Sequence, residues 1–226
     1  MIPASTPEWY AARVGMITAS RMGDLSAKTK SGYGATHDRY IAQLVQERLT
    51  HQPYPRFTSK AMQWGIDHED EAAELYAWTR NVEVQAAGFV PHPTIPRCGA
   101  SPDRRVGDDG LIEIKCPETH THIQYLLNRS VPREYLLQMQ WQMECDGRAW
   151  CDWISYDPRF EGGDIPPGSE MLVIRVQRDE TTIRDLCSEV RRGDAEVQRL
   201  IERLVTVPRP KGRGFSLQQE EPDARI

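Results

Sequence analysis

Two short segments near the middle of this 226-residue chain bring together residues that could hydrolyse a phosphodiester bond. The segment SPD (101–103) supplies the carboxylate of Asp103, and the segment EIKC (113–116) supplies the carboxylate of Glu113 and the amine of Lys115. Carboxylate oxygens are the ligands that Mg²⁺ takes. The bound metal lowers the pKa of a water and neutralises charge on a phosphate. Lys115 is then a candidate for orienting or deprotonating that water.

Strand geometry supports this interpretation. Residues two apart in a strand share a face, so a strand over 111–116 places Glu113 and Lys115 on one face and the alternate residues on the other. We expect Asp103 to end the preceding strand. The segment GDDG (107–110) is a turn signal, and a tight connection there would bring Asp103 beside Glu113. From these residues alone, an exposed hairpin with a solvated polar face remains the alternative.

The elements that must position these residues follow from hydrophobic periodicity and from Gly and Pro positions. Helices are predicted at 8–13, 18–25, 36–49, 59–79, 118–128, 132–146 and 179–205, the last with a potential break at Gly193. Strands are predicted at 82–90, 95–101, 111–116, 149–156 and 170–176, and a mobile loop at 26–35. This order predicts one mixed α/β domain over 1–207, with a central mixed β-sheet flanked by helices, and a flexible C-terminal tail over 208–226.

Composition narrows the class of protein. The formal net charge of −5 counts against extensive nucleic-acid coating, although basic residues gather in 1–60 and acidic ones in 67–74. No apolar run approaches the roughly 20 residues that span a bilayer, and the first residues do not resemble a signal peptide. Five scattered cysteines without a C-x-x-C pair argue against a zinc site and a disulfide framework. We therefore expect a cytosolic protein without a membrane partner.

Several other residues could serve the same site. Glu69 lies about one helical turn beyond Trp64-Gly65 and could reach the metals, or it could belong to a solvated helical face. Arg13 and Ser20 flank the start of a predicted helix and could hold a terminal phosphate; a surface arginine and an N-cap are the alternative. Gln138 could bond a water, a metal-bound carboxylate or DNA, or could be an ordinary polar helix residue.

Together and in this order, these segments resemble the lambda exonuclease and YqaJ-like viral recombinase family, within the PD-(D/E)xK nuclease superfamily. The resemblance extends from about residue 9 to about residue 176. Its matching segments are W-x-x-x-R-x-G-x-I-T-A-S (9–20), A-M-Q-W-G-x-x-x-E (61–69), S-P-D (101–103), E-I-K-C-P (113–117), Q-M-Q (138–140) and Y-D-P-R (156–159).

The resemblance implies a restriction-endonuclease-like core and a Mg²⁺-dependent 5′-to-3′ exonuclease with two ions per site, in which Mn²⁺ can substitute. Its substrate would be linear double-stranded DNA with a 5′-phosphorylated end, and its product a 3′ overhang for a phage single-strand annealing protein. A ring-shaped homotrimer, encoded by a phage or prophage and located in the cytoplasm of a bacterial host, is also implied.

The resemblance further implies residue roles. The implied metal ligands are Asp103, Glu113, Glu69 and the Ile114 backbone carbonyl. Lys115 would position the attacking water, and Gln138 would support the acidic site. The implied contacts to DNA and its 5′ phosphate are Arg13, Ser20, Ser101, Trp9, and Met62 as an apolar wedge that splits the duplex end.

One departure and two alternatives accompany the resemblance. The family has an arginine shortly after E-x-K-C-P, where this chain has THTH (119–122). His122 or His120 could replace that DNA contact, in which case activity would fall as the pH rises above ~6.5. The alternatives are a DNA endonuclease of the same superfamily, for which no extra recognition domain is found, and a non-catalytic module that binds DNA ends or the annealing protein.

Overall fold

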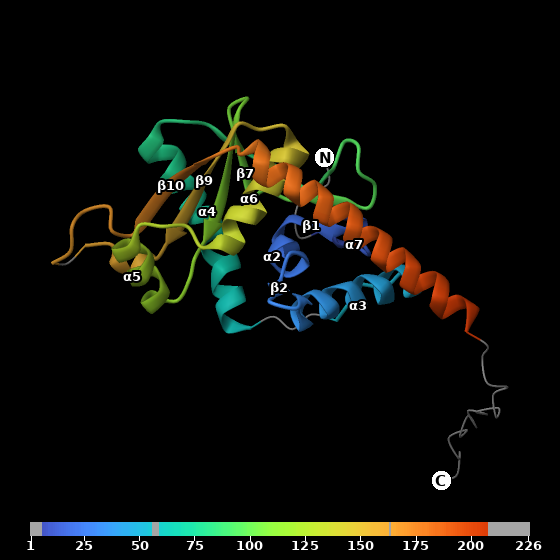
Figure 1. Cartoon of the computed structure of the whole chain (residues 1–226). Coiled ribbons are helices and arrows are strands. Elements are labelled where there is room, and N and C mark those ends of the chain that lie inside the picture. The colour runs from blue at the N-terminus through green and yellow to red at the C-terminus, as the bar shows by residue number, and fades with distance from the viewer. Residues whose placement is uncertain (1–5, 56–58, 163, 208–226) are drawn as a thin grey trace, which may run out of the picture.

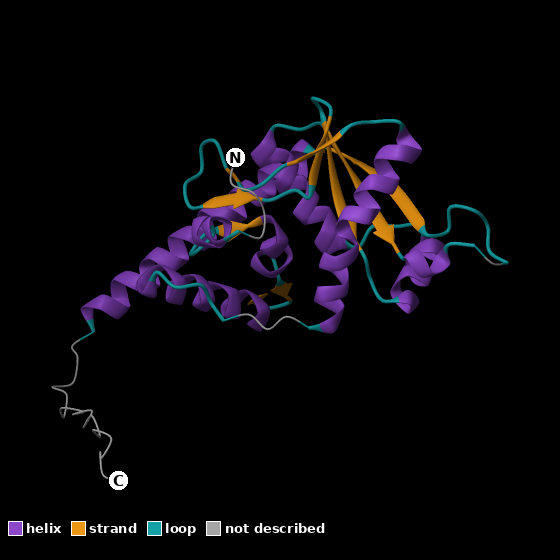
Figure 2. Cartoon of the chain, turned by 180° about the vertical axis from the view of Figure 1, so that it is seen from behind, coloured by secondary structure: helices purple, strands orange, loops and turns teal. Residues whose placement is uncertain are grey.

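A computed structural model of the chain describes residues 6–55, 59–162 and 164–207 (Figure 1). The tail predicted over 208–226 lies outside the described residues. Two layers of structure lie side by side, one built on a five-stranded sheet and the other on helices around a small three-stranded sheet (Figures 1 and 2). The prediction of a mixed α/β fold with a central mixed sheet is confirmed.

The larger sheet has the strand order β10-β9-β8-β7-β4. Strands β8 and β9 are parallel, and the other neighbouring pairs of strands are antiparallel. The strands are β4 (Val84–Ala86), β7 (Arg104–Val106), β8 (Gly110–Lys115), β9 (Trp150–Tyr156) and β10 (Met171–Gln177). Since β8 and β9 run parallel, their carboxyl ends meet at one edge of the sheet, and α5 (Thr119–Asn128) lies beyond that edge (Figure 1).

Two helices cover the faces of this sheet. Helix α4 (Lys60–Arg80) packs Ala72, Ala73 and Tyr76 against one face, and α6 (Arg133–Asp146) packs Met139 and Met143 against the other. Alternate residues of β8 divide between them: Ile112 and Ile114 join the α4 side, whereas Leu111 joins the α6 side. The predicted two-residue alternation along 111–116 is therefore confirmed.

The second layer surrounds a sheet of order β1-β6-β5. Its strands are β1 (Ile17–Thr18), β5 (Val90–Pro91) and β6 (Cys98–Ala100). Its helices are α1 (Pro7–Ala12), the 3₁₀ turn η1 (Ala19–Arg21), α2 (Met22–Leu25), α3 (Ala35–Thr50) and the long α7 (Glu180–Thr206), which runs diagonally across the molecule (Figure 1). One buried apolar cluster joins α2, α3, α6 and α7.

Four sequence predictions were wrong in detail. The strand predicted over 82–90 is two strands, β4 and β5, which belong to different sheets because the chain crosses between the layers. Residues 26–35 form a short hairpin of β2 (Lys28–Thr29) and β3 (Gly32–Tyr33) rather than a mobile loop. The helix predicted over 18–25 begins as strand β1 at Thr18, since that residue pairs with Gly99. Strand β7 was missed because its three residues were assigned to the turn.

Helix α7 is continuous through Gly193, so the potential break is also wrong. A Cβ atom at this position would lie 2.7 Å from Cδ1 of Leu25. Glycine therefore costs some helix stability but lets α7 approach α2 closely. Within the described residues, no helix is both long and apolar enough to cross a membrane.

Candidate active site

Asp103 and Glu113 meet where the β7–β8 hairpin opens. Arg104 pairs with Ile112, so Asp103 lies one register position beyond the pair and directly beside Glu113. The turn depends on Gly107, whose φ of +53° glycine adopts without a steric penalty. Oδ2 of Asp103 accepts a hydrogen bond from the Ile114 amide at 2.6 Å. The predicted proximity is confirmed, but Asp103 precedes β7 rather than ending an earlier strand.

Glu113 is 1% exposed and is held at both carboxylate oxygens. Its Oε1 contacts Nζ of Lys115 and accepts a hydrogen bond from Nε2 of Gln138 at 2.6 Å. Its Oε2 accepts a hydrogen bond from Nε2 of Gln142, also at 2.6 Å. Sequence reasoning missed Gln142. The available signal was its spacing of four residues from Gln138, which places both amides on one face of α6.

The charges at this site are unbalanced. Burial, followed by the charges of Glu113 and Glu69, raises the pKa of Asp103 well above its usual range. Burial lowers the pKa of Lys115, but the charges of Glu113 and Asp103 outweigh burial and raise that pKa overall. Lys115 is therefore held as a cation, while the neighbouring carboxylates repel each other. A further positive charge would relieve this repulsion.

Glu69 reaches the site from the other side of the sheet. It lies on α4, where its Oε1 accepts a hydrogen bond from Nη1 of Arg104 at 3.1 Å. Arg104 also contacts Asp70. The charge of Glu69 contributes to the raised pKa values of both Asp103 and Cys116, after burial, so this carboxylate is within electrostatic reach of the hairpin.

The donor set fits a hard divalent cation. The amide and carbonyl of one residue face the same side of a strand. The Ile114 carbonyl therefore lies on the side of β8 that faces β7, where the Ile114 amide binds Asp103 just outside the paired residues of β7. The hairpin thus offers carboxylate and carbonyl oxygens, and α4 adds a third carboxylate. Oxygen donors of this kind select Mg²⁺, Ca²⁺ or Mn²⁺ over softer metals.

A second group of residues is centred on Ser101, which lies two positions before Asp103 in the sequence. Nε1 of Trp9 donates a hydrogen bond to Oγ of Ser101 at 3.0 Å, and the Arg13 guanidinium lies 3.8 Å from the centre of the Trp9 ring. Three of the predicted phosphate contacts are thereby joined to one another and to the SPD segment. Ser20 is exposed in η1, the turn that follows β1.

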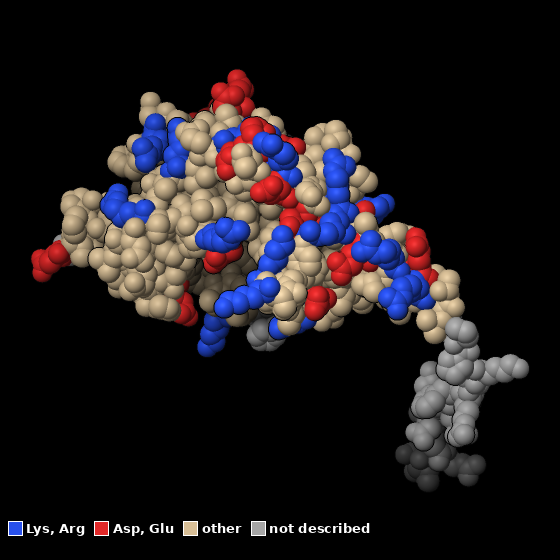
Figure 3. Space-filling view, viewed as in Figure 1, with Lys and Arg blue, Asp and Glu red and all other residues tan. Residues whose placement is uncertain are grey.

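Met62 lies near the start of α4 with 52% of its surface exposed. It lines a cavity of about 580 Å³ together with Arg21, Arg39 and Tyr54. Because Arg39 belongs to α3 and Met62 to α4, the cavity lies between these two helices. The space-filling view shows a hollow between the two layers of the molecule, with several Lys and Arg side chains around it (Figure 3). An exposed apolar side chain thus stands beside a cationic cleft.

The sequence and the fold of this chain are similar to those of known proteins. The family model for the YqaJ-like viral recombinase domain matches residues 8–149. The chain belongs to this family. Two crystal structures of the alkaline exonuclease LHK-Exo from Laribacter hongkongensis, one in complex with dAMP, are 41% identical to the chain. In each case the matched region covers 88% of this chain and 96% of the LHK-Exo chain, with a TM-score of 0.81.

A phage-related exonuclease from Haemophilus somnus 129PT shares the fold at 15% identity. Its TM-score is 0.67, with 84% of this chain and 96% of that chain covered. No curated protein matches the sequence. The family resemblance inferred from the six sequence segments is confirmed.

His122 is not at the surface in this family member, so its predicted contact with DNA phosphate is wrong. The side chain lies on the inner face of α5 and is fully buried. Its Nδ1 lies 2.7 Å from Oγ of Ser155, and its Nε2 lies 2.8 Å from the Ser169 carbonyl oxygen. Both ring nitrogens are therefore hydrogen-bonded inside the protein and do not face DNA. His120 is exposed, but its Nδ1 lies 3.5 Å from a carboxylate oxygen of Glu118.

The fold also gathers His92, Glu144 and Cys187, whose potential ligand atoms lie within 4.8 Å of one another. The scattered cysteine positions gave no sign of this group. Nδ1 of His92 accepts hydrogen bonds from the amides of Thr94 and Ile95, at 3.1 and 3.0 Å. Neutral His92 must then carry its proton on Nε2, the nitrogen that faces Glu144, so it has no lone pair there for a metal. We interpret this group as a polar packing contact.

Proposed function

We propose that this protein is a divalent-metal-dependent exonuclease that degrades one strand of linear double-stranded DNA from a 5′-phosphorylated end and leaves a 3′ overhang. The observation that supports it most is the convergence of Asp103, Glu113 and Lys115 at the carboxyl end of β8. The 41% identity with an alkaline exonuclease over 88% of the chain supports the same reaction class. The dAMP in that protein's structure supports a nucleic-acid substrate.

The metal-binding residues in this proposal are Asp103, Glu113, Glu69 and the Ile114 carbonyl. They would hold two Mg²⁺ ions, for which Mn²⁺ would substitute. Bound Mg²⁺ would supply an acidified water and neutralise charge on the attacked phosphate and its leaving oxygen. Arg104 contacts Glu69 in this structure, and would have to share or release that carboxylate when the cation is bound.

The protein's own groups position the reactants. Lys115 is a cation in contact with Glu113, so in this proposal it orients the attacking water by donating a hydrogen bond. Gln138 and Gln142 each donate to a different oxygen of Glu113, which fixes the plane of that carboxylate. A fixed carboxylate lowers the cost of reorganisation during the reaction.

A pocket for the 5′ phosphate is proposed at Arg13, with Trp9, Ser20 and Ser101 around it. The guanidinium lies over the Trp9 ring, and Trp9 is hydrogen-bonded to Ser101. A planar guanidinium fixed in this way suits phosphate, which it can bind through two parallel hydrogen bonds. Met62, exposed beside the cleft, would act as a wedge between the last base pairs.

The biological setting forms part of the same proposal. The family description as a viral recombinase domain and the phage-related relative support a phage or prophage enzyme in a bacterial cytoplasm. We propose a ring-shaped homotrimer that passes its 3′ overhang to a phage single-strand annealing protein.

The test is digestion of a linear duplex, with one end 5′-phosphorylated and the other 5′-hydroxylated, in Mg²⁺ and in EDTA. We expect stepwise, Mg²⁺-dependent loss from the phosphorylated 5′ end by the wild type and none by Lys115→Ala. Closed circular DNA should survive. Its cleavage would favour an endonuclease, and duplex binding without Mg²⁺-dependent loss would favour a non-catalytic module.

A further inference from the structure

Two arginines of this fold are held in the same way near opposite ends of β9. Arg159 lies in the 3₁₀ turn η2 (Pro158–Phe160), which follows β9. Its Nε and Nη2 donate to the two carboxylate oxygens of Asp157 at 2.7 and 3.0 Å. Its guanidinium carbon lies 4.4 Å from the centre of the Trp64 ring on α4.

Arg175 on β10 repeats this arrangement. Its Nε and Nη2 donate to the two oxygens of Asp152 at 2.8 and 2.9 Å, and its guanidinium lies 3.6 Å from the centre of the Trp150 ring. Both aspartates are buried. The arginine side chains are almost equally exposed, at 48% for Arg159 and 49% for Arg175. The sites differ in that Asp152 also accepts a hydrogen bond from the Tyr76 hydroxyl, and in their positions relative to the catalytic hairpin.

The Arg159 guanidinium retains donors for a ligand, whereas Arg175 also contacts the side chain of Tyr76. Arginine has five N–H groups, and the bidentate contact uses two of them. The remaining three keep a fixed direction, because the aspartate and the indole together hold the planar group in place. A pre-oriented fork of this kind matches phosphate oxygens and loses little conformational entropy on binding.

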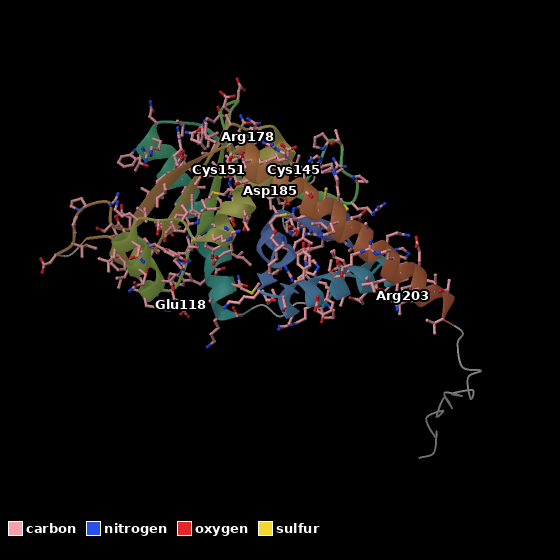
Figure 4. The ribbon with its side chains drawn as sticks, viewed as in Figure 1. Glu118, Cys145, Cys151, Arg178, Asp185 and Arg203 are labelled. Atoms are coloured by element: carbon pink, nitrogen blue, oxygen red, sulfur yellow. The ribbon has the colours of Figure 1, made fainter. Side chains whose placement is uncertain are left out.

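Position separates the two sites. Lys115 is paired with Ser155, so Asp157 and Arg159 follow β9 at the same edge where β8 ends. The carboxylate of Asp157 is also hydrogen-bonded to the side chain of Thr119, the first residue of α5. Figure 4 labels Glu118, the residue before Thr119, at the lower end of the sheet, well away from Arg178 near the amino end of β9.

The distances along the elements suit DNA. Trp64, beneath Arg159, precedes Glu69 on α4 by five residues, or about 7.5 Å of helix rise. This offset is short enough for a phosphate one or two nucleotides from the scissile one to reach Arg159, since one strand of duplex DNA rises ~3.4 Å per nucleotide along the helix axis. Asp152 is five strand residues before Asp157, or roughly 16 Å farther from this edge. Trp64 also packs in one apolar cluster with Cys116, the residue after Lys115.

We propose that Arg159 binds a backbone phosphate of the DNA held at the catalytic hairpin, whereas Arg175 serves the fold alone. This inference rests on the proposed nuclease function. Asp157 already balances the charge of Arg159, so the contact supplies hydrogen-bond geometry more than long-range attraction. Lysine should therefore replace Arg159 poorly, since an ammonium group cannot bind Asp157 and a phosphate through a planar fork.

The test measures binding in EDTA to linear duplexes that each carry one neutral methylphosphonate at a successive position near the 5′ end. For wild type and Arg175→Ala, we expect one or two positions where the neutral linkage weakens binding by about tenfold. Arg159→Ala should bind the unmodified duplex about tenfold more weakly and show no further loss at those positions. Arg159→Lys should behave like Arg159→Ala. This loss of coupling identifies a direct contact, because a structural defect would leave the phosphate dependence unchanged.

The double variant Asp157→Asn, Arg159→Gln guards against misfolding, since it leaves no unpaired buried carboxylate. If this variant and Arg159→Ala keep the wild-type sensitivity to every methylphosphonate, the proposed contact is wrong, even when wild type digests linear duplex normally. If wild type neither digests nor binds linear duplex, the proposed function fails and the inference falls with it. Equal losses in Arg159→Ala and Arg175→Ala would also overturn the proposal.

Discussion

Glu113 and Asp152 are buried carboxylates on neighbouring strands, 1% and 2% exposed, but their surroundings differ. Asp152 receives two hydrogen bonds from Arg175 and one, at 2.7 Å, from the Tyr76 hydroxyl. Glu113 accepts hydrogen bonds from two neutral side-chain amides and contacts one cation, Lys115. The carboxylates of Asp103 and Glu69 add further negative charge near the same hairpin.

This difference shows how the fold separates stability from chemistry. A buried carboxylate costs free energy unless it is paired and hydrogen-bonded. At Asp152 the protein supplies that compensation itself. Around Glu113 the carboxylates of Asp103, Glu113, Glu69 and Asp70 outnumber the cations Lys115 and Arg104, and the raised pKa of Asp103 is consistent with this excess of negative charge. A cation from solution would balance the charge at the Glu113 site, but it has no role at the Asp152 site.

The largest effect expected from this comparison concerns activity. Glu113→Gln should lower the rate of exonuclease digestion by at least about 10²-fold, because one metal ligand and the partner of Lys115 are lost. Asp152→Asn should leave the rate per folded molecule unchanged but lower the free energy of unfolding by about 1–2 kcal/mol, a value reduced by the exposure of Arg175. Single-turnover digestion and denaturant unfolding of the same preparations measure both quantities. The comparison fails if Asp152→Asn is inactive although fully folded.

The second prediction concerns pH and metal. The pKa of Asp103 is raised in the folded state, so its ionised form destabilises the fold, and stability falls as the pH rises from the ordinary value of about 3.9 through the raised one. In EDTA, Asp103→Asn should be more stable than wild type at pH 8, and this gain should disappear at pH 3.5.

Added Mg²⁺ should reverse the order at pH 8. Wild type should gain about 2.7 kcal/mol at a metal concentration 100 times the dissociation constant. Asp103→Asn should gain much less, and Asp152→Asn should gain as much as wild type. Thermal unfolding with and without Mg²⁺ tests this expectation. An equal shift in Asp103→Asn would show that the cation binds elsewhere.

A smaller effect should distinguish two glutamines of α6. Gln142→Leu removes the donor to Oε2 of Glu113, and we expect about a tenfold loss of activity. Gln140→Leu is the matched control. Its amide nitrogen donates to the Gln177 carbonyl and its oxygen accepts from the Asp179 amide, so its loss should reduce stability alone. Digestion rates corrected for the folded fraction provide the measurement. Equal activity in Gln142→Leu and wild type would remove Gln142 from the site.

The smallest expected effect is at the compensated carboxylate. Tyr76→Phe removes the hydroxyl that donates to Asp152, while the two hydrogen bonds from Arg175 remain. We expect the free energy of unfolding to fall by about 1 kcal/mol, with digestion and the Mg²⁺ response unchanged. Denaturant unfolding measures the loss. A reduced Mg²⁺ response in this variant would mean that the two carboxylates are coupled through the sheet.

Much of the catalytic hairpin could be predicted from local patterns. Turn glycines and two-residue alternation brought Asp103 beside Glu113 and placed Lys115 on the same face, because strand geometry depends on neighbouring residues alone. His122 was misjudged for the opposite reason. Nothing in its local sequence indicates that Ser155 and the Ser169 carbonyl will enclose it.

The sequence by itself determined the family, the mixed α/β class, the hairpin with its two carboxylates and the lysine, and the Trp9–Arg13 segment. These features lie in short segments whose spacing is set by helix and strand repeats. Only the tertiary structure decided which sheet each half of 82–90 joins, that Gln142 holds Glu113, and that Arg104 contacts Glu69. It also decided that Arg159 and Arg175 stand near opposite ends of one strand. Such contacts join residues far apart in the chain, and they exist only after the sheet is paired and its covering helices are packed.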